Sequence, residues 1–163
     1  MSSRVDGDFV QRVGASIVVS HGYRHILRPA TLAVLPHRFV NLHISLLPWN
    51  RGADPNLWSF LEDTPKGVTI HEIDEGIDTG SIIAQRVVRV DIRGTLATTY
   101  RELQEAMLEL FTETWPAIRA GAVEGRPQQP GGSLHTLKDK EPYLHLLRHG
   151  WDTHVSELIG KAL

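Results

Sequence analysis

Short apolar runs along the chain predict four strands. Residues 15–20, Ala-Ser-Ile-Val-Val-Ser, form a β-branched run closed by Gly22, which is typical of a buried parallel strand. Residues 38–45 form a second run that ends before Pro48, and residues 68–73 and 81–90 have the character of strands. The glycine-rich, acidic stretch between the last two runs predicts a hairpin-like excursion.

Helices are expected between and after these strand-like runs. A short helix is expected over 30–35, after Pro29. Asp54 and Pro55 have the positions of an N-cap and a first helical residue, which predicts a second helix over 53–61. Residues 98–119 predict the longest helix, because apolar side chains recur there every three or four positions. These are Leu103, Met107, Leu110, Phe111 and Ile118.

The mixture of strands and helices indicates an α/β fold, and the 163 residues fit one globular domain with a substantial core. Residues 121–132 hold two prolines and four glycines, which predicts an exposed connection. We therefore expect a core over 1–125 and a C-terminal extension over 126–163. One or two short helices around Gly150 are expected in this extension.

Composition and charge exclude several classes of function. The formal net charge of -2, with no basic run, gives no strong attraction for nucleic acid. The sequence shows neither a long apolar stretch nor a secretion signal, so we expect a cytoplasmic protein without a membrane partner. The absence of cysteine excludes disulfides and thiolate chemistry. Catalysis would therefore depend on His, Asp, Glu, Asn, Ser or Lys.

The strand over 38–45 carries the clearest candidate chemistry. Asn41, His43 and Ser45 alternate along it and therefore share one face, while the apolar Leu42 and Ile44 occupy the other. An amide beside an imidazole at a strand end is where α/β folds place ligand sites. Taken alone, the pair fits a hydrogen-bonded polar edge better than catalysis.

A longer ordered pattern covers roughly residues 15–85. It runs Asn41-Leu-His43-Ile-Ser45-Leu-Leu-Pro48, Gly52, Gly67-Val-Thr-Ile-His71 and Asp78-Thr-Gly80. This pattern resembles the N10-formyltetrahydrofolate-dependent formyltransferase family. The resemblance implies a Rossmann-like sheet and assigns catalysis to Asn41, His43 and Asp78. The alternative role for Asp78 is to cap its own turn before Gly80.

The implied chemistry is transfer of a formyl group from N10-formyltetrahydrofolate to an amine through a tetrahedral oxyanion. Asn41 and a protonated His43 would donate hydrogen bonds to this oxygen. Asp78 would favour the imidazolium and accept the proton of the amine, directly or through water. No metal is required.

The resemblance also places the donor's pterin ring beside two loops. One loop follows the first strand, and the other, through the main chain of Asp74 and Glu75, leads to Asp78. The positions implied in the first loop are Gly22, Tyr23, Arg24, His25 and Leu27.

Residues 48–60, 63–67, 138–140 and 150–153 look most like the sugar N-formyltransferases. This subgroup acts on nucleotide-linked 4-amino-4,6-dideoxyhexoses, such as dTDP-4-amino-4,6-dideoxyglucose, for surface polysaccharides including lipopolysaccharide O-antigen. Trp49 would line the sugar site, and Arg51 and Lys66 would contact the pyrophosphate. A homodimer is an open alternative to a monomer.

Several alternatives remain open. Methionyl-tRNA and glycinamide ribonucleotide formyltransferases share the fold. The family begins with strand-helix units, of about 30 residues or more each, ahead of the strand at 15–20. Their absence here indicates an N-terminally truncated sheet. A non-catalytic folate-binding remnant is therefore another alternative. A metal hydrolase built on His43, His71 and Asp78 lacks a ligand motif, and His71 has a simpler structural role.

Overall fold

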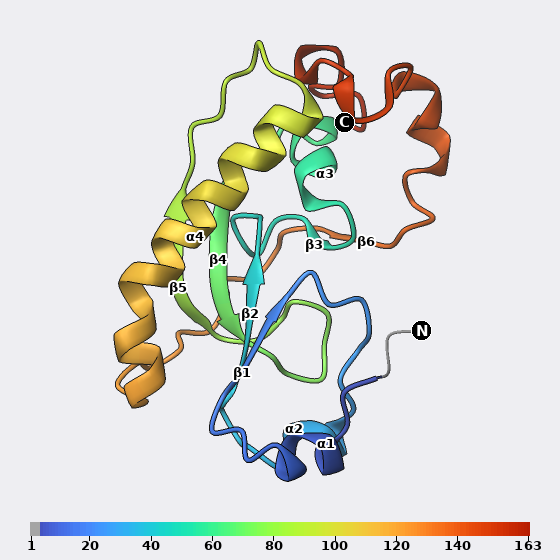
Figure 1. Cartoon of the computed structure of the whole chain (residues 1–163). Coiled ribbons are helices and arrows are strands. Elements are labelled where there is room, and N and C mark those ends of the chain that lie inside the picture. The colour runs from blue at the N-terminus through green and yellow to red at the C-terminus, as the bar shows by residue number, and fades with distance from the viewer. Residues whose placement is uncertain (1–3) are drawn as a thin grey trace.

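The computed structural model describes residues 4–163 and has a mixed α/β architecture (Figure 1). Its main sheet has the strand order β1-β2-β4-β5. Strand β1 (Val18–His21) runs parallel to β2 (Phe39–His43), whereas β4 (Gly67–Glu72) is antiparallel both to β2 and to β5 (Ile82–Val87). The expected hairpin is therefore confirmed as the β4–β5 pair.

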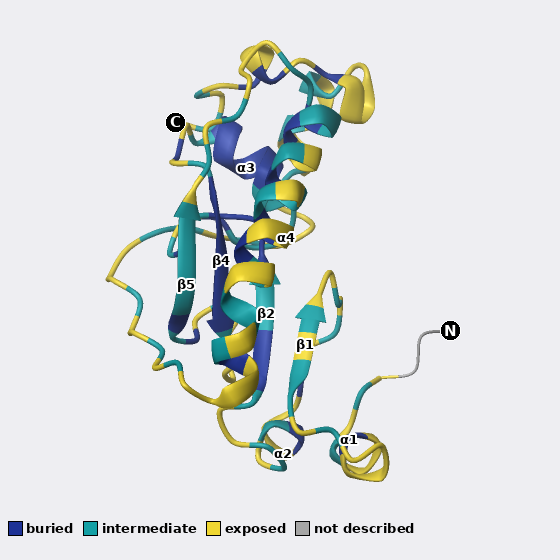
Figure 2. Cartoon of the chain, turned by 60° about the vertical axis from the view of Figure 1, so that its left-hand side comes forward, coloured by how far each residue is buried: buried dark blue, intermediate teal, exposed yellow. Residues whose placement is uncertain are grey.

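Burial differs strongly across the sheet (Figure 2). Strand β4 is buried over Gly67–His71, since β2 and β5 flank it and α4 covers it. Strand β1 was expected to be buried, but its residues alternate between intermediate and exposed, and Val19 is 37% exposed. The reason is its edge position, because within residues 4–163 only β2 pairs with it. The run is also shifted, starting at Val18.

The long helix α4 (Leu96–Ala120) matches its predicted span and packs across the sheet (Figure 1). Its start is fixed by a capping box in which Thr95 and Thr98 exchange side-chain and backbone hydrogen bonds. Gly121 ends it in the left-handed conformation, φ 68°. The core between α4 and the sheet consists of Val40, Ile44, Val68, Ile70, Leu103, Met107, Leu110 and Ile118.

Three short helices complete the core region. Helices α1 (Gly7–Arg12) and α2 (Pro29–Leu32) lie together below the sheet in Figure 1, and α2 ends earlier than the expected residue 35. Helix α3 (Pro55–Leu61) is buried over six of its seven residues. Asp54 precedes it as predicted, but with φ 52° and without a side-chain capping hydrogen bond.

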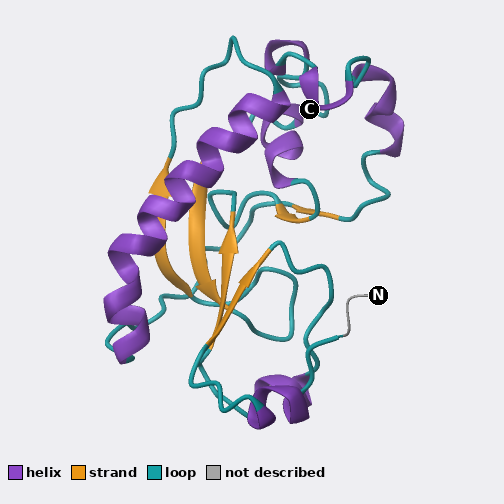
Figure 3. Cartoon of the chain, in the orientation of Figure 1, coloured by secondary structure: helices purple, strands orange, loops and turns teal. Residues whose placement is uncertain are grey.

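The C-terminal part returns to the core (Figure 3). Strand β6 (Leu134–His135) pairs in parallel with β3 (Arg51–Gly52). It is followed by three 3-10 helices, η1 (Glu141–Leu146), η2 (Gly150–Asp152) and η3 (Val155–Glu157). Val155 and Leu158 are buried against α3 and Leu96. Within residues 4–163, no helix combines the length and the apolar character needed to cross a membrane.

Candidate active site

The three residues expected to act together line one cavity of about 720 Å³. Asn41 and His43 lie two positions apart on β2, and Asp78 lies in the loop between β4 and β5. The β4–β5 hairpin folds back beside β2, so this loop reaches the strand that carries the other two residues. The structure thus brings the predicted triad together.

The carboxylate of Asp78 is held by donors on both oxygens. Its Oδ2 accepts a hydrogen bond from the Gly52 backbone N–H at 2.8 Å, and its Oδ1 accepts one from Asn41 Nδ2 at 3.1 Å. His71 Nε2 lies 3.4 Å from Oδ1. Burial alone would raise the pKa of Asp78, but the contacts with His71, His43 and Gly52 outweigh it and lower that pKa far below its usual range. Asp78 is therefore ionised.

The imidazole of His43 is almost completely buried and faces Asp78. Its Nε2 lies 3.0 Å from the Asn50 carbonyl oxygen, which can only accept, so Nε2 carries a proton. Its Nδ1 lies 3.5 Å from Asp78 Oδ2. Burial is the largest effect on the pKa of His43 and lowers it, whereas the Asp78 carboxylate raises it, as expected, by a smaller amount. The net pKa is lowered, so the imidazole is neutral at pH 7 rather than protonated.

Asn50 fixes the orientation of His43 and was missed from the sequence. It is fully buried at φ 56°, a conformation that asparagine tolerates better than most residues. Its Oδ1 accepts a hydrogen bond from Thr64 Oγ1 at 2.8 Å, and its Nδ2 donates to Glu62 Oε2 at 3.1 Å. Its backbone N–H donates to Ser133 Oγ at 3.0 Å. These partners are distant in sequence, so no local pattern indicated them.

Gly52 and the Asp78 loop meet under tight steric constraints. Gly52 has φ 85°, and a Cβ there would lie 2.2 Å from the His135 carbonyl oxygen. Only glycine therefore presents its N–H to Asp78 at this place. From the other side, Gln128 Nε2 donates to the carbonyl oxygens of Asp78 and Gly80 at 2.7 and 2.9 Å. Gln128 is a second positioning residue without a sequence signal.

His71 also belongs to the polar cluster. Its Nδ1 donates to the Glu72 carbonyl oxygen at 2.7 Å, and its Nε2 lies 3.2 Å from Asn41 Nδ2. Its side chain is 2% exposed, so it supports Asn41 and Asp78 from inside. The predicted hydrogen-bonded structural role is consistent with these contacts. Among residues 4–163, no group of three His, Cys, Asp or Glu side chains has the geometry of a metal site.

The loop residues implied for folate binding separate into two groups. Gly22, Tyr23 and Arg24 line the same cavity as the triad, together with His21. Leu27 is instead buried with the N-terminal core, and His25 packs its ring against Tyr23.

Asp74 lies in the second implied loop, and its Oδ1 accepts hydrogen bonds from Gly76 N–H and Thr79 Oγ1. It lines a neighbouring cavity of about 570 Å³ rather than the one with the triad. The adjacent Glu75 is exposed. The roles of Asp74 and Glu75 in pterin binding stay predictions.

The three residues predicted for the nucleotide sugar lie outside the lining of the triad cavity. Arg51 borders the neighbouring cavity and donates to the Gly131 carbonyl oxygen at 3.0 Å. Lys66 donates to the Thr64 carbonyl oxygen at 2.8 Å, and Trp49 is partly exposed. Their contacts with substrate stay predictions.

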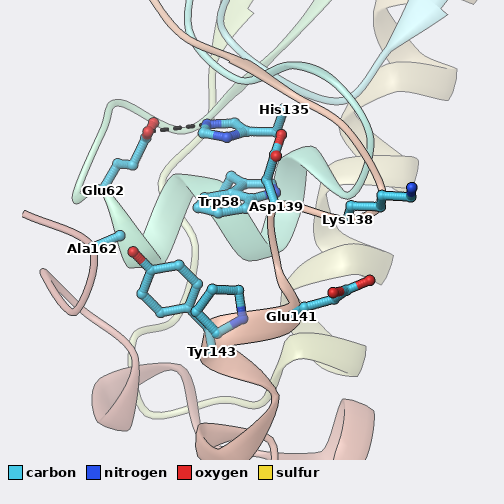
Figure 4. Close-up of a pocket in the computed structure, with 9 residues that line it drawn as sticks. Trp58, Glu62, His135, Lys138, Asp139, Glu141, Tyr143 and Ala162 are labelled. Atoms are coloured by element: carbon cyan, nitrogen blue, oxygen red, sulfur yellow. Dashed lines mark ion pairs between the residues drawn. The ribbon is translucent and has the colours of Figure 1, made fainter.

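A third cavity of about 540 Å³ lies between α3 and the C-terminal segment (Figure 4). Trp58 and His135 stack there with ring centroids 3.7 Å apart, and Tyr143 meets Trp58 edge to face. His135 Nε2 lies 3.0 Å from Glu62 Oε1. Trp58 is 3% exposed, as expected for a core residue. This cluster joins the C-terminal segment to the residues that hold Asn50.

The cavity with the triad combines an ionised carboxylate, a neutral imidazole and an amide at the carboxyl end of β2. General acid–base chemistry and the stabilisation of an oxyanion use side chains of these types. The chain belongs to the formyl transferase family, whose model matches residues 5–114.

Individual relatives refine this assignment. One similar structure is that of the formyltransferase PseJ from Anoxybacillus kamchatkensis in complex with UDP-4,6-dideoxy-4-formamido-L-AltNAc and tetrahydrofolate. The two sequences are 53% identical, and the structures superpose with a TM-score of 0.95. The match covers 100% of this chain and 86% of that one. The dTDP-4-amino-4,6-dideoxyglucose formyltransferase of Mycobacterium tuberculosis is 38% identical over 104 residues, 64% of this chain and 44% of the relative. A methionyl-tRNA formyltransferase from Agathobacter rectalis is 32% identical over 130 residues, 79% of this chain and 42% of the relative. The chain thus spans less than half of the length of these two curated relatives.

Proposed function

We propose that this protein transfers a formyl group from N10-formyltetrahydrofolate to the amine of a nucleotide-linked amino sugar. The observation that carries the proposal is the convergence of Asn41, His43 and Asp78 on one cavity that the loop at Gly22 also lines. The likeness to PseJ, whose structure holds a formamido sugar nucleotide and tetrahydrofolate, supports both substrate classes.

In the proposed reaction, the amine nitrogen attacks the formyl carbon and forms a tetrahedral intermediate with a negative oxygen. The bond between that carbon and N10 of the folate then breaks, and N10 takes up a proton. The products are tetrahydrofolate and the N-formyl sugar. No metal or covalent protein intermediate is required for these steps.

His43 suits the role of proton acceptor. Its neutral imidazole has Nε2 protonated toward Asn50, which leaves the Nδ1 lone pair to receive the proton of the attacking amine. The imidazolium formed in this way would face the Asp78 carboxylate at 3.5 Å, which stabilises it until the proton passes to N10. Asn41 supplies the amide donor for the developing oxyanion once one of its two N–H groups leaves Asp78 or His71.

The acceptor we favour is a 4-amino-4,6-dideoxyhexose. The sugar in the PseJ complex carries its formamido group at position 4, and the M. tuberculosis relative is named for a 4-amino sugar. These two relatives differ in the nucleotide, UDP in one and dTDP in the other. Trp49, Arg51 and Lys66 are the proposed contacts of the acceptor outside the triad.

We further propose a cytoplasmic location and a role in surface polysaccharide synthesis such as O-antigen, since nucleotide sugars are made in the cytoplasm.

The residues 126–163 form an extension that completes the core over 1–125, and a homodimer fits the proposal as well as a monomer does. Nucleic acid is a disfavoured substrate because the chain has a net charge of -2.

The test is a panel of amines incubated with N10-formyltetrahydrofolate and the purified chain, with products identified by mass spectrometry. UDP- and dTDP-linked 4-amino-4,6-dideoxyhexoses, glycinamide ribonucleotide and methionyl-tRNA would be compared at equal concentration. The proposal expects formylation of a sugar nucleotide. Exclusive formylation of either other amine would replace the proposed acceptor, and tetrahydrofolate binding without any transfer would indicate a non-catalytic remnant.

A further inference from the structure

Glu62 follows the last residue of α3 and connects Asn50 to the C-terminal segment. Its Oε2 accepts hydrogen bonds from Asn50 Nδ2 at 3.1 Å and from Ser133 Oγ at 2.7 Å. Its other oxygen, Oε1, lies 3.0 Å from His135 Nε2, at ion-pair distance but out of line for a hydrogen bond (Figure 4). The side chain of Glu62 is 21% exposed. This largely buried carboxylate therefore joins the end of α3 to β6 and to the residue before it.

The hydrogen bonds of Glu62 give a closed ring of three residues one direction. A carboxylate only accepts hydrogen bonds, so the Ser133 hydroxyl gives its proton to Glu62. The hydroxyl oxygen is then left to accept the Asn50 backbone N–H, 3.0 Å away. Asn50 Nδ2 completes the ring by donating to the same carboxylate. Without this carboxylate, the Ser133 hydroxyl and the Asn50 amide would lose their acceptor inside the protein, which is costly.

The peptide group between Asn50 and Arg51 links this ring to the triad. The Arg51 N–H donates to the Ser133 carbonyl oxygen at 2.9 Å. In a planar trans peptide the carbonyl points away from the N–H, and here the Asn50 carbonyl oxygen lies 3.0 Å from His43 Nε2. This acceptor keeps a proton on Nε2 and leaves the lone pair on Nδ1. The position of the Asn50 carbonyl therefore decides which nitrogen of His43 can accept a proton.

A second acceptor makes the tautomer of His43 sensitive to this position. Asp78 Oδ2 lies 3.5 Å from Nδ1 and would favour a proton on that nitrogen if the Asn50 carbonyl moved away. The two neutral tautomers thus compete, one held by Asn50 and the other by Asp78. A small displacement of residue 50 would be enough to change the balance between them.

We propose that Glu62 is a positioning residue for formyl transfer, which through Asn50 fixes the orientation and the tautomer of His43. The inference rests on the proposed function, in which His43 Nδ1 accepts the proton of the amine. Other charged side chains line the cavity beside Glu62 in Figure 4, namely Lys138, Asp139 and Glu141. Among the residues that the structure describes, none of these three forms a hydrogen bond with Asn50.

The first measurement needs no substrate. Nitrogen NMR of the histidine rings distinguishes the two neutral tautomers, and comparison with His43→Gln identifies the signals of His43. At about pH 8, above the ordinary pKa of histidine, the wild-type chain should carry the proton of His43 on Nε2. In Glu62→Ala both tautomers should be populated, since Asp78 then competes with a displaced Asn50 carbonyl.

The second measurement is the kinetics of formyl transfer by Glu62→Gln. A carboxamide has one acceptor oxygen and a donor group in place of the second acceptor, so it cannot serve both the ring and His135. We expect kcat to fall about tenfold or more, since misplacing a catalytic group is costly, with a smaller change in KM. The matched control is Glu141→Gln, the same chemical change at an exposed residue of the same cavity, which should leave kcat and the His43 spectrum unchanged.

A third variant separates the two contacts of the carboxylate. His135→Phe keeps a ring stacked on Trp58 but removes the nitrogen beside Glu62, while the bonds to Asn50 and Ser133 remain. Its kcat and its His43 spectrum should stay close to those of the wild type. Losses as large as those in Glu62→Gln would assign Glu62 the purely structural task of holding β6 and would overturn the inference.

Two further results would overturn it. One is a His43 proton found on Nε2 alone in Glu62→Ala, with the circular dichroism spectrum of the wild type. The other is equal kcat in Glu62→Gln and Glu141→Gln. If Glu62→Ala does not fold, the spectrum of Glu62→Gln decides in its place. Failure of the proposed function is a different outcome, in which the wild-type chain formylates no sugar nucleotide, and the spectra then decide alone whether Glu62 sets the tautomer of His43.

Discussion

Asp78 is ionised inside the protein because its contacts with His71, His43 and the Gly52 N–H outweigh the effect of burial on its pKa. The Asn41 carboxamide also donates to its carboxylate. Burying such a charge is costly unless its oxygens are hydrogen-bonded. The same carboxylate also lies 3.5 Å from His43 Nδ1, so one side chain organises the amide and the imidazole together. We therefore expect its negative charge to matter more than its shape.

Replacing Asp78 with asparagine separates charge from shape. Asp78→Asn keeps the size of the side chain and an acceptor for Gly52, but it removes the charge that would stabilise a protonated His43. We expect kcat to fall about 10²-fold or more, with the circular dichroism spectrum unchanged. Turnover within a few-fold of wild type would show that the carboxylate serves only to hold its loop.

The lowered pKa of His43 predicts the pH dependence of activity. A proton acceptor works only in its neutral form, so kcat/KM should be flat above neutrality and fall with decreasing pH through a midpoint below 6.5, the ordinary value for histidine. His145→Gln, a change at an exposed histidine, should leave the profile unaltered. A midpoint above 6.5 would contradict the neutral, buried imidazole.

The stability of the fold should also decrease as the pH falls. In the unfolded chain His43 takes up a proton near its ordinary pKa of 6.5, whereas in the folded protein it does so only at lower pH. The unfolded state therefore binds more protons in this window, and the free energy of unfolding contributed by His43 decreases as the pH falls below 6.5.

The sequence identified the site residues that lie on a single strand or in a recognisable motif. Asn41 and His43 share a face because of strand alternation, and Asp78 came from the resemblance. Asn50 and Gln128 were missed because they act through contacts that close only in the fold. The protonation of His43 was misjudged because burial depends on packing around it.

At the level of elements, the loop between β4 and β5 is held in place by Gln128 from the connection after α4. Gln128→Leu removes the donor to the carbonyl oxygens of Asp78 and Gly80 while keeping the volume similar. We expect kcat to fall about tenfold, since misplacing a catalytic group is costly, with a smaller change in KM. The matched control is Gln129→Leu, at an exposed neighbour. Equal kcat in both variants would refute the positioning role of Gln128.

Helices and strands were predicted correctly where a periodic apolar pattern extended over many residues or where an apolar run was flanked by turn residues. Helix α4 and the β4–β5 hairpin followed their patterns closely. The prediction that β1 would be buried was wrong, because an apolar run does not show how many strands will flank it in the sheet. The β3–β6 pair joins two-residue strands about 80 positions apart, and no local signal marks such a pairing.

For the whole molecule, the C-terminal segment packs into a hydrophobic cluster with α3 and the start of α4. Leu158 is fully buried against α3 and the start of α4, whereas Leu163 is 91% exposed. Leu158→Ala should reduce the free energy of unfolding by about 2–5 kcal/mol, and Leu163→Ala should change it by less than about 0.5 kcal/mol. Urea denaturation measures both. Equal stability of the two variants would mean that the extension packs independently of the core.

The central claim is that the cavity of Asn41, His43 and Asp78 transfers a formyl group to a sugar nucleotide. The most direct measurement is the rate of formyl transfer from N10-formyltetrahydrofolate to UDP- and dTDP-linked 4-amino-4,6-dideoxyhexoses by the wild-type chain and by His43→Ala, at saturating donor. The account predicts turnover by the wild type and a loss of about 10²-fold or more in the variant, with tetrahydrofolate still bound by both. A wild-type chain that binds tetrahydrofolate but transfers nothing, or a variant as fast as wild type, would contradict it.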